Sequence, residues 1–249
     1  MTIALITGGS RGLGRSMALH LARAGVDVVI TYHSNEAAAR EVVAEVEGLG
    51  RRARAHRLDT SDLRAFPAFA EGLGATLAEM GDGKLDHLVN NAGTGLHVPF
   101  AETTEAQFDE MMGIHLKGVF FLTQALLPMI RDGGRILNVS SGLARFAIPG
   151  SSAYAAMKGA VEVLTRYLAK ELGPRGISAN VIAPGAIATD FGGGQVRDNP
   201  DMNRAVASMT AMGRVGLPDD IGAAVASLLT SPSNWITGQR IEASGGQMI

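Results

Sequence analysis

Short apolar runs alternate with longer amphipathic stretches along most of the chain. The runs are rich in β-branched residues and predict strands at 2–7, 27–32, 51–58, 85–90, 134–140, 177–183 and 238–243. The stretches between them have helical spacing and predict helices at 14–25, at 35–50, in a region ending at Met80, around His115, at 152–172 and at 218–230. Strands that alternate with helices in this way form repeated βαβ units, so we expect an α/β fold, a doubly wound parallel sheet with helices on both faces.

The pattern loosens after Pro184, where three consecutive glycines at 192–194 and a proline interrupt weakly helical stretches. Irregular segments of this length inside a compact fold are commonly functional lids, so we expect a substrate lid around 188–214. No linker or internal repeat divides the rest of the pattern. Residues 1–249 are therefore expected to form a single domain.

Composition excludes several classes of function. The net charge is −2 and the Lys and Arg residues are scattered, so we expect no nucleic-acid partner. The chain has no cysteine, which excludes a thiol nucleophile and Cys-type zinc sites and is typical of the reducing cytoplasm. No apolar stretch is long enough to cross a bilayer, and no targeting pattern precedes the first strand. A cytoplasmic protein with no membrane partner and no metal site is expected.

The run "TGGSRGLG" at 7–14 follows the first predicted strand and opens the first helix. Glycine at positions 8, 12 and 14 lets the backbone approach a pyrophosphate, whose charge would lie on free amides at the helix amino terminus. A glycine-rich string alone can be a tight turn, but its place between strand and helix favours a nucleotide site. We therefore predict a Rossmann-type dinucleotide-binding catalytic domain.

The end of the second strand indicates which dinucleotide is bound. An Asp or Glu there would accept hydrogen bonds from the adenosine ribose and repel a 2′-phosphate. The run "VVITYHSN" has no acid: Tyr32 stands in that place, and His33 and Ser34 can donate hydrogen bonds. Arg11 in the glycine loop is a candidate phosphate clamp, with a solvated surface side chain as the competing interpretation. We predict a preference for NADP(H).

A second constellation is "SSAYAAMKGAVE", in which Tyr154 and Lys158 lie one helical turn apart. Ser141 ends the preceding strand, so all three side chains are expected at one crevice. A nearby ammonium would lower the pKa of Tyr154 until the phenol exchanges a proton with a carbonyl or alcohol oxygen near neutrality. Ser141 would hold that oxygen by a hydrogen bond.

Five short patterns in order give the chain its family resemblance. They are Thr-Gly-x-x-x-Gly-x-Gly at 7–14, Asn-Asn-Ala-Gly at 90–93, Ser141, Tyr-x-x-x-Lys at 154–158 and Pro-Gly at 184–185. Together they resemble the short-chain dehydrogenase/reductase family over essentially the whole chain.

The resemblance implies a role for each matching residue. Tyr154 would be the proton donor in carbonyl reduction, Lys158 would tune it and bind the nicotinamide ribose, and Ser141 would orient the carbonyl. Asp59 matches the acid that contacts the adenine amino group, and the 184–189 segment would line the nicotinamide carboxamide. The implied cofactor-binding set is Gly8, Ser10, Arg11, Gly12, Leu13, Gly14, Tyr32, His33, Ser34, Asp59, Thr60, Asn90, Ala92, Gly93, Tyr154, Lys158, Pro184, Gly185, Ile187 and Thr189.

His115 departs from the family pattern. Members usually have Asn in this "NLKG"-like segment, where it helps to hold a water that links the active-site lysine to solvent; here the segment reads "HLKG". An imidazole also donates and accepts a hydrogen bond, and it titrates near neutrality where Asn does not. We expect His115 to replace the Asn as a fourth catalytic residue, rather than to be a packed core histidine.

The function implied is an NADP(H)-dependent oxidoreductase that interconverts a ketone or 3-oxoacyl carbonyl and a secondary alcohol. The chain most resembles 3-oxoacyl-[acyl-carrier-protein] reductases, but basic residues near the expected crevice are interspersed with acids, so a free ketone fits as well as a carrier-bound acyl group. An alternative from another class is an NADP(H)-sensing binding protein without turnover. Intact Ser141, Tyr154 and Lys158 favour the enzyme, because a sensor needs no tuned phenol.

Three further expectations concern the surroundings of the site. Family members are usually tetramers or dimers, so the resemblance implies a homotetramer or dimer built on the helices at 113–130 and 152–172. Arg145 is expected to be a solvated side chain rather than a charge-reading group, and Ser244 replaces an acid that is common in the family. An apolar pocket wall is expected from Leu96, Leu143, Phe146, Ile148 and Phe191.

Overall fold

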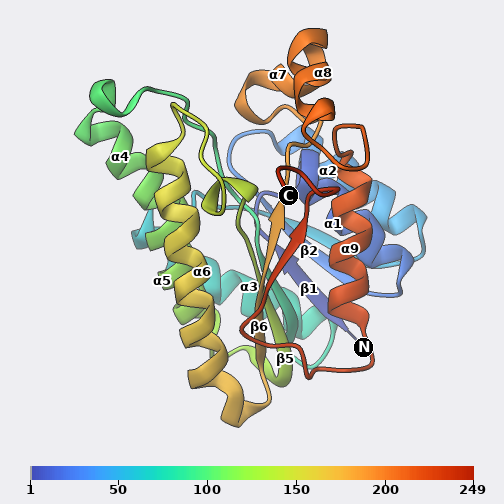
Figure 1. The fold of residues 1–249 in the computed structure, drawn as a ribbon. Helices are drawn as coiled ribbons and strands as arrows, with labels where there is room; N and C mark the ends of the chain where they lie inside the picture. The colour runs from blue at the N-terminus through green and yellow to red at the C-terminus, as the bar shows by residue number, and fades with distance from the viewer. Residues whose placement is uncertain (1) are drawn as a thin grey trace.

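The computed structural model describes residues 2–249, which form a seven-stranded sheet with helices on both faces (Figure 1). Every strand pair is parallel, which confirms the α/β fold expected from the alternating pattern. The strands are β1 (Ile3–Ile6), β2 (Asp27–Tyr32), β3 (Ala53–Arg57), β4 (Leu85–Asn90), β5 (Ile130–Val139), β6 (Ser178–Pro184) and β7 (Arg240–Ala243).

The strand order is β3-β2-β1-β4-β5-β6-β7, so the chain winds outward from β1 in one direction and then returns to build the other half from β4. The carboxyl ends of β1 and β4 therefore mark the switch point of the sheet. Loops on either side of such a point diverge and leave a crevice, which is where ligands bind in open sheets of this type.

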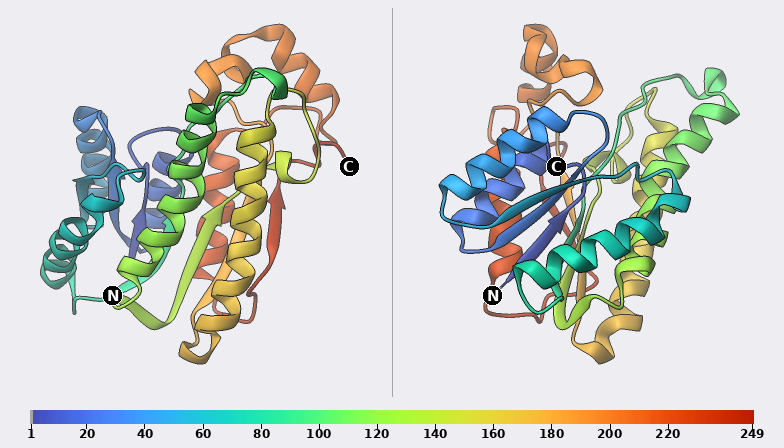
Figure 2. Two further views of the ribbon diagram at one scale, coloured as in Figure 1. Left: turned by 90° about the vertical axis from the view of Figure 1, so that its left-hand side faces the viewer. Right: turned by 180° about the vertical axis from the view of Figure 1, so that it is seen from behind.

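Two helical layers cover the sheet (Figure 2). One core cluster joins α1 and α9 to residues such as Ile6 and Val28, and the other joins α3, α5 and α6 to residues such as Leu5 and Leu88. Parallel sheets need apolar residues on both faces for this reason. The α-helices are α1 (Gly12–Arg23), α2 (Glu36–Gly48), α3 (Phe66–Met80), α4 (Glu105–Met112), α5 (Gly118–Leu126), α6 (Ser152–Leu172), α7 (Gln195–Asp198), α8 (Pro200–Ser208) and α9 (Pro218–Thr230).

The structure differs from the expected elements in two places that concern the site. The long helix around His115 is not α-helical throughout, because a π-helical turn at Gly113–Lys117 lies between α4 and α5. β5 begins at Ile130 rather than at 134, since Ile130 pairs with Leu85 before a register shift in the β4–β5 ladder. Short 3₁₀ turns lie at Leu63–Ala65, Phe100–Glu102, Gly142–Ala144, Gly173–Arg175 and Phe191–Gly194.

The segment expected to be a lid contains α7 and α8, which stand beyond the carboxyl ends of the strands (Figure 1). Its far end is tied to the carboxyl-terminal tail by an isolated bridge between Thr210 and Gln247. Backbone hydrogen bonds from Ala211 to Gly246 and from Met212 to Gly245 continue this contact. The tail therefore fastens one end of the segment to the body of the protein.

Close packing of Gly118, the first residue of α5, on the β3–α3 loop generates a stability prediction. A Cβ on Gly118 would lie 2.2 Å from the Thr60 carbonyl oxygen, whereas a Cβ on Gly72 in α3 meets nothing within 4 Å. We expect Gly118→Ala to lower the free energy of unfolding by about 2 kcal/mol through overpacking. The matched control, Gly72→Ala, should raise it by about 0.5–1 kcal/mol because alanine favours helix. Urea denaturation measures both; equal effects would contradict the packing.

Candidate active site

The glycine loop after β1 forms one wall of the crevice. Gly8 and Gly12 have φ of +66° and +54°, which favour glycine, and a Cβ on Gly8 would lie 3.0 Å from the Ala92 Cα. No side chain caps the amino terminus of α1, where Arg11 is the N-cap residue. The glycines thus bring bare backbone to an uncapped helix terminus, a donor set that fits an anionic pyrophosphate.

Hydrogen bonds from the 90–93 segment fix this loop against β4. Thr7 Oγ1 accepts from the Asn91 and Ala92 amides at 2.9 Å, and Asn91 Nδ2 donates to the Thr7 carbonyl at 2.8 Å. The predicted cofactor-binding set leaves out Asn91, although its place in the Asn-Asn-Ala-Gly pattern is the signal for it. The Asn90 Nδ2 group donates inside the fold to Thr123 and Asn138, so its hydrogens are not available to the crevice.

The far corner of the crevice lies at the ends of β2 and β3. His33 Nε2 lies 3.5 Å from Asp59 Oδ2, and hydrogen bonds from Ser61 hold the pKa of Asp59 below its usual value against the opposing effect of burial. The structure thus brings His33 and Asp59 together, as the sequence predicts for an adenosine corner. The Arg11 guanidinium does not point to this corner but lies 3.8 Å from Asp190 in the 188–214 segment.

Helix α6 places Tyr154 and Lys158 against the carboxyl end of β5. Both side chains are buried, and Ser141, which follows β5, makes a side-chain hydrogen bond with Tyr154. Lys158 Nζ donates to the Val139 carbonyl oxygen at 2.7 Å and lies 5.5 Å from the centre of the Tyr154 ring. The structure therefore gathers the three side chains that the sequence predicts to act together.

The protonation states differ from the sequence prediction. Burial raises the pKa of Tyr154 to about 12, with the Ser141 hydrogen bond opposing it, and burial lowers the pKa of Lys158 to about 8. The expectation that the ammonium brings the Tyr154 pKa near neutrality is wrong for this structure. The reason is that loss of water around the phenolate outweighs the ammonium, whose hydrogen bond goes to Val139 instead.

His115 lies inside the π-helix and packs against Tyr154. Its Nε2 lies 2.8 Å from the Thr94 carbonyl oxygen, which accepts only, so Nε2 carries the proton and Nδ1 is a free lone pair. Nδ1 is buried and has no partner among the described residues. The ring meets Tyr154 edge to face at 5.1 Å between centroids, and a Cβ on Gly93 would lie 2.6 Å from its Cε1.

The imidazole of His115 is neutral in the working range of pH. Burial, together with repulsion from Lys158, lowers its pKa to about 3, and the Thr94 hydrogen bond only partly opposes this. The expectation that His115 titrates near neutrality is therefore wrong, because the ring has almost no contact with water. What remains is a fixed neutral tautomer with one acceptor atom unused, in a π-turn of the kind often found at functional sites.

An aromatic residue of the 188–214 segment lies beside Tyr154. The Phe191 ring lies 5.8 Å from the Tyr154 ring centre, and a Cβ on Gly95 would lie 3.0 Å from Phe191 Cε1. Leu96 and Leu143 pack against the buried cluster that contains Tyr154, whereas Ile148 is exposed. Of the expected apolar wall, Leu96, Leu143 and Phe191 are thus placed around the phenol.

The loop after β6 supplies the remaining wall. Gln247 Oε1 accepts from the Ala186 amide at 2.9 Å, and Ile187 bridges to Gly216. Thr189 Oγ1 accepts from the Phe191 amide at 3.2 Å, which joins this loop to the aromatic cover. Pro184 ends β6 and Gly185 follows it, so the segment predicted to meet the nicotinamide lies beside the site.

Arg145 does not behave as expected from the sequence, and Ser244 shares one of its partners. Arg145 is not a freely solvated side chain, since it donates to Glu242 at 2.7 and 2.8 Å and to the Gln247 carbonyl at 2.6 Å. The sequence prediction fails because these partners lie at the far end of the chain. Ser244 Oγ donates to the same Glu242 carboxylate at 2.9 Å.

Comparisons with known proteins show what the chain is similar to. A family model described as enoyl-(acyl carrier protein) reductase matches residues 8–247. The hydroxynaphthalene reductase-like protein Arp2 of Metarhizium brunneum is 36% identical, and the alignment covers 99% of this chain and 94% of that protein. The tetrahydroxynaphthalene reductase PfmaG of Pestalotiopsis fici is 35% identical, with 98% and 90% covered.

Two solved ketoreductase structures have the same fold. The promiscuous reductase LugOII, which catalyses keto-reduction at C1 during lugdunomycin biosynthesis, superposes with a TM-score of 0.94 at 41% identity, covering 99% of this chain and 97% of that one. The angucycline C-6 ketoreductase LanV with bound NADP superposes with a TM-score of 0.93 at 37% identity, with 99% and 95% covered.

The neutral state of His115 generates a prediction for stability. The unfolded chain protonates this ring below a pKa of about 6.5, whereas the folded protein protonates it only near 3. The free energy of unfolding should therefore fall as pH falls through this window, and the contribution should be fully present above it. We expect His115→Asn to make the slope between about pH 6 and 4 shallower by up to about 1.4 kcal/mol per pH unit. Urea denaturation at several pH values measures the slope; an unchanged slope would show that the ring is charged in the folded state.

Proposed function

Because the chain belongs to the short-chain dehydrogenase/reductase family, we propose that it is an NADP(H)-dependent ketoreductase that converts a ketone to a secondary alcohol. The observation that carries the proposal is the meeting of Ser141, Tyr154 and Lys158 at the end of β5. These are an oxygen-binding hydroxyl, a proton donor and a buried cation, the set that reduction of a carbonyl needs.

Ser141 and Tyr154 hold the substrate oxygen between them in this proposal. A carbonyl oxygen there accepts a hydrogen bond from each hydroxyl, and both bonds strengthen as negative charge develops. NADPH supplies the hydride to the carbonyl carbon. The pKa of about 12 keeps Tyr154 protonated, which is the state that a proton donor for reduction needs.

Lys158 restores the proton that Tyr154 gives up, and His115 accepts a hydrogen bond from a water in the same relay. The buried Lys158 amino group, with a pKa of about 8, is able to give and regain a proton near neutrality. It also stabilises the tyrosinate that forms beside it. We assign His115 the role of a neutral acceptor: its free Nδ1 takes a hydrogen bond from a water in the relay, and its Nε2–H keeps donating to the Thr94 carbonyl oxygen. This is the substitute for the usual Asn, without titration of the ring.

The cofactor site in this proposal follows the crevice from β2 to β6. The uncapped amides at the start of α1 and the glycines around them hold the pyrophosphate. Tyr32, His33 and Ser34 meet the adenosine end without an acid at the carboxyl end of β2, which favours NADP(H) over NAD(H). Pro184, Gly185, Ile187 and Thr189 lie at the nicotinamide end. The solved LanV structures contain NADP, which supports the same cofactor here.

We propose a flat aromatic ketone as the substrate class. The Phe191 ring lies 5.8 Å from the Tyr154 ring, is tilted to it by 56° and is 48% exposed, so it offers an aromatic surface beside the proposed proton donor. The named substrates of similar proteins, hydroxynaphthalenes and angucyclines, are fused ring systems. A 3-oxoacyl thioester is the alternative substrate.

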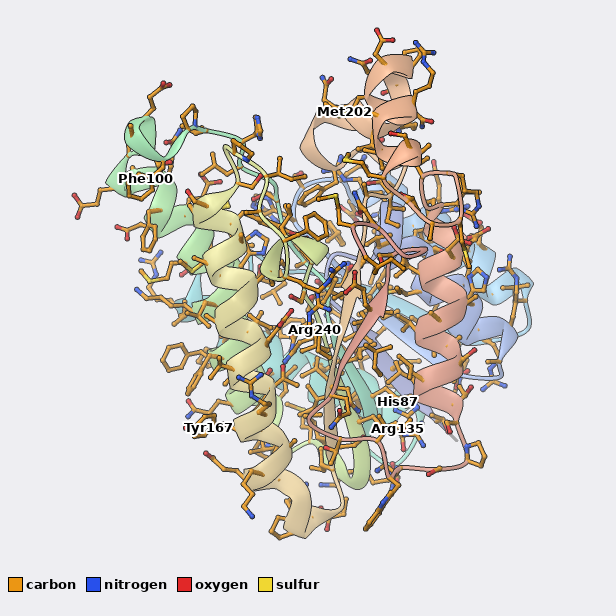
Figure 3. The ribbon with its side chains drawn as sticks, viewed as in Figure 1. His87, Phe100, Arg135, Tyr167, Met202 and Arg240 are labelled. Atoms are coloured by element: carbon orange, nitrogen blue, oxygen red, sulfur yellow. The ribbon has the colours of Figure 1, made fainter. Side chains whose placement is uncertain are left out.

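The assembly we propose is a homotetramer built on α5 and α6. These helices lie side by side on one face (Figure 2), and Phe120, Phe121, Val163 and Tyr167 are exposed on them. Tyr167 stands on the outer side of α6 (Figure 3). An apolar patch of this kind is typical of a subunit interface.

A cytoplasmic location, expected from the cysteine-free composition, stays a prediction. Among the described residues no helix is long and apolar enough to cross a membrane.

The first prediction concerns the proton donor. Tyr154→Phe removes only the hydroxyl, so we expect NADPH oxidation with fused-ring ketones to fall at least about a thousandfold. NADPH binding, measured by fluorescence titration, should change less than about threefold. Absence of turnover with every ketone in the wild-type protein, with tight NADPH binding, would support the sensing alternative. Turnover retained by Tyr154→Phe would refute the assigned mechanism.

The second prediction concerns cofactor choice. Arg11 is 74% exposed and lies 3.8 Å from Asp190, so we propose that its side chain leaves this loose ion pair and turns to the 2′-phosphate when NADP(H) binds. Arg11→Gln should then raise KM for NADPH about tenfold, the equivalent of one charge-assisted hydrogen bond. KM for NADH should change little. Arg40→Gln, which removes a surface guanidinium paired with Glu36 on α2, is the matched control. Equal changes for NADPH and NADH would place Arg11 away from the 2′-phosphate.

A further inference from the structure

Four charged side chains form a chain of ion pairs behind Ser141, and none of them belongs to the proposed reaction. Arg240 Nε donates to Glu162 at 2.8 Å, and Arg240 Nη1 donates to Glu242 at 2.8 Å. Glu242 also accepts from Arg145, at 2.7 and 2.8 Å. The order Glu162, Arg240, Glu242, Arg145 alternates in sign and joins α6 to β7 and to the turn after Ser141. Figure 3 shows Arg240 in the interior of the molecule, between α6 and the strands.

This ion-pair chain touches the backbone that carries Ser141. Arg240 Nη2 donates to the Ser141 carbonyl oxygen at 3.3 Å, and Ser140 Oγ donates to Glu162 at 2.7 Å. The preceding residue, Val139, is held by Lys158 Nζ. Three consecutive residues at the end of β5 are therefore each fixed by a charged side chain.

The regular spacing on α6 explains how one helix does this. Tyr154, Lys158 and Glu162 are separated by four residues each, so they lie along one face of α6. Tyr154 meets the substrate oxygen in our proposal, Lys158 holds Val139, and Glu162 holds Ser140. Arg240 and Glu242 are two residues apart on β7, so their side chains lie on the same side of the sheet.

Burial makes these ion pairs more than surface contacts. The side chains of Glu162 and Arg240 are only 14% and 23% exposed, so solvent screens their attraction weakly. Burial raises the pKa of Glu242, but hydrogen bonds from Arg145, Arg240 and Ser244 outweigh this effect and bring that pKa down to about 2. The carboxylate is therefore charged. Arg145 continues to the Gln247 and Met248 carbonyls and so anchors the network to the carboxyl-terminal tail.

We propose that Glu162 and Arg240 are positioning residues for Ser141, and that Glu242 and Arg145 hold Arg240 in place. They fix the backbone on both sides of the Ser141 Cα, and hence the direction in which Ser141 Oγ points toward the substrate oxygen. A small displacement of such a donor is costly, because the hydrogen bond must form at the developing oxyanion. This inference rests on the proposed ketoreductase function.

A comparable ion pair elsewhere provides the control. Arg131 donates to Asp82 at 2.7 Å and to Asp86 at 2.9 Å, so it also bridges two carboxylates. It lies at the opposite, amino-terminal end of β5 and contacts no residue of the site. Arg131→Gln therefore removes a similar pair of ionic contacts without affecting the Ser141 segment.

The test compares Arg240→Gln, Arg240→Lys, Glu162→Gln and Arg131→Gln in the full-length protein. We expect Arg240→Gln to lower kcat with an aromatic ketone by about tenfold, with the NADPH dissociation constant changed less than about twofold. Arg240→Lys keeps the charge and should recover part of the loss. Glu162→Gln keeps an acceptor for the Ser140 hydroxyl, so its kcat should fall less, by about threefold. Arg131→Gln should keep the kcat of the wild type.

Amide hydrogen exchange gives a readout that does not depend on turnover. The Leu143 amide donates to Ser141 Oγ at 3.2 Å, so its protection reports the position of the Ser141 side chain. Exchange of the 139–145 segment should be faster in Arg240→Gln and Glu162→Gln and unchanged in Arg131→Gln.

The outcomes separate this inference from the proposed function. Wild-type kcat and exchange in both Arg240→Gln and Glu162→Gln would overturn the positioning role, as would equal losses in Arg131→Gln. If the wild-type protein reduces no ketone, the proposed function fails and the exchange measurement alone decides whether the ion-pair chain fixes Ser141. If Arg240→Gln does not fold, Glu162→Gln, which is nearly isosteric, decides.

Discussion

The hydrogen bond from Lys158 Nζ to the Val139 carbonyl oxygen fastens α6 to the carboxyl end of β5. Val139 is the last residue of β5 and pairs with Ile182 of β6, and at this strand end its carbonyl oxygen accepts from a side chain. Once the lysine is held there, Tyr154 lies one turn earlier on α6 and Ser141 two residues later on the chain. The geometry of the site thus follows from one contact between a helix and a strand end, and the cofactor crevice lies beside it because the loops that follow β1 and β4 diverge at the same edge.

Burial sets the protonation of every titratable group at this contact. It disfavours the charged form of each group, so Tyr154 keeps its proton, the Lys158 amine approaches neutrality and His115 is uncharged. These shifts are useful for reduction, in which the phenol must donate. They also make the site depend on fixed hydrogen bonds rather than on a titrating imidazole. The π-turn at His115 adds to this, because it places the ring against Tyr154 with its tautomer fixed by Thr94.

The sequence predicts those parts of the molecule that repeat a simple pattern. The expected strands at 27–32 and 85–90 and the helices at 152–172 and 218–230 coincide with β2, β4, α6 and α9. The meeting of Tyr154, Lys158 and Ser141 follows from strand order alone. The π-turn does not, because a helix with one extra residue in a turn has no distinct apolar period. Neither do the pKa values, since a partner and its degree of burial are properties of the packed structure. Arg145 and Glu242 are far apart in sequence, so only the fold reveals that the arginine is bound.

The most direct test of the account is the fate of the hydride. The protein is incubated with an aromatic ketone and NADPH that carries deuterium at its transferable position, and the alcohol is analysed by mass spectrometry and NMR. Hydride transfer to the ketone predicts one deuterium in the alcohol, on the carbon that was the carbonyl. An alcohol without deuterium, or NADPH that stays bound and unconsumed with every ketone, would contradict the claim that this site reduces a carbonyl group.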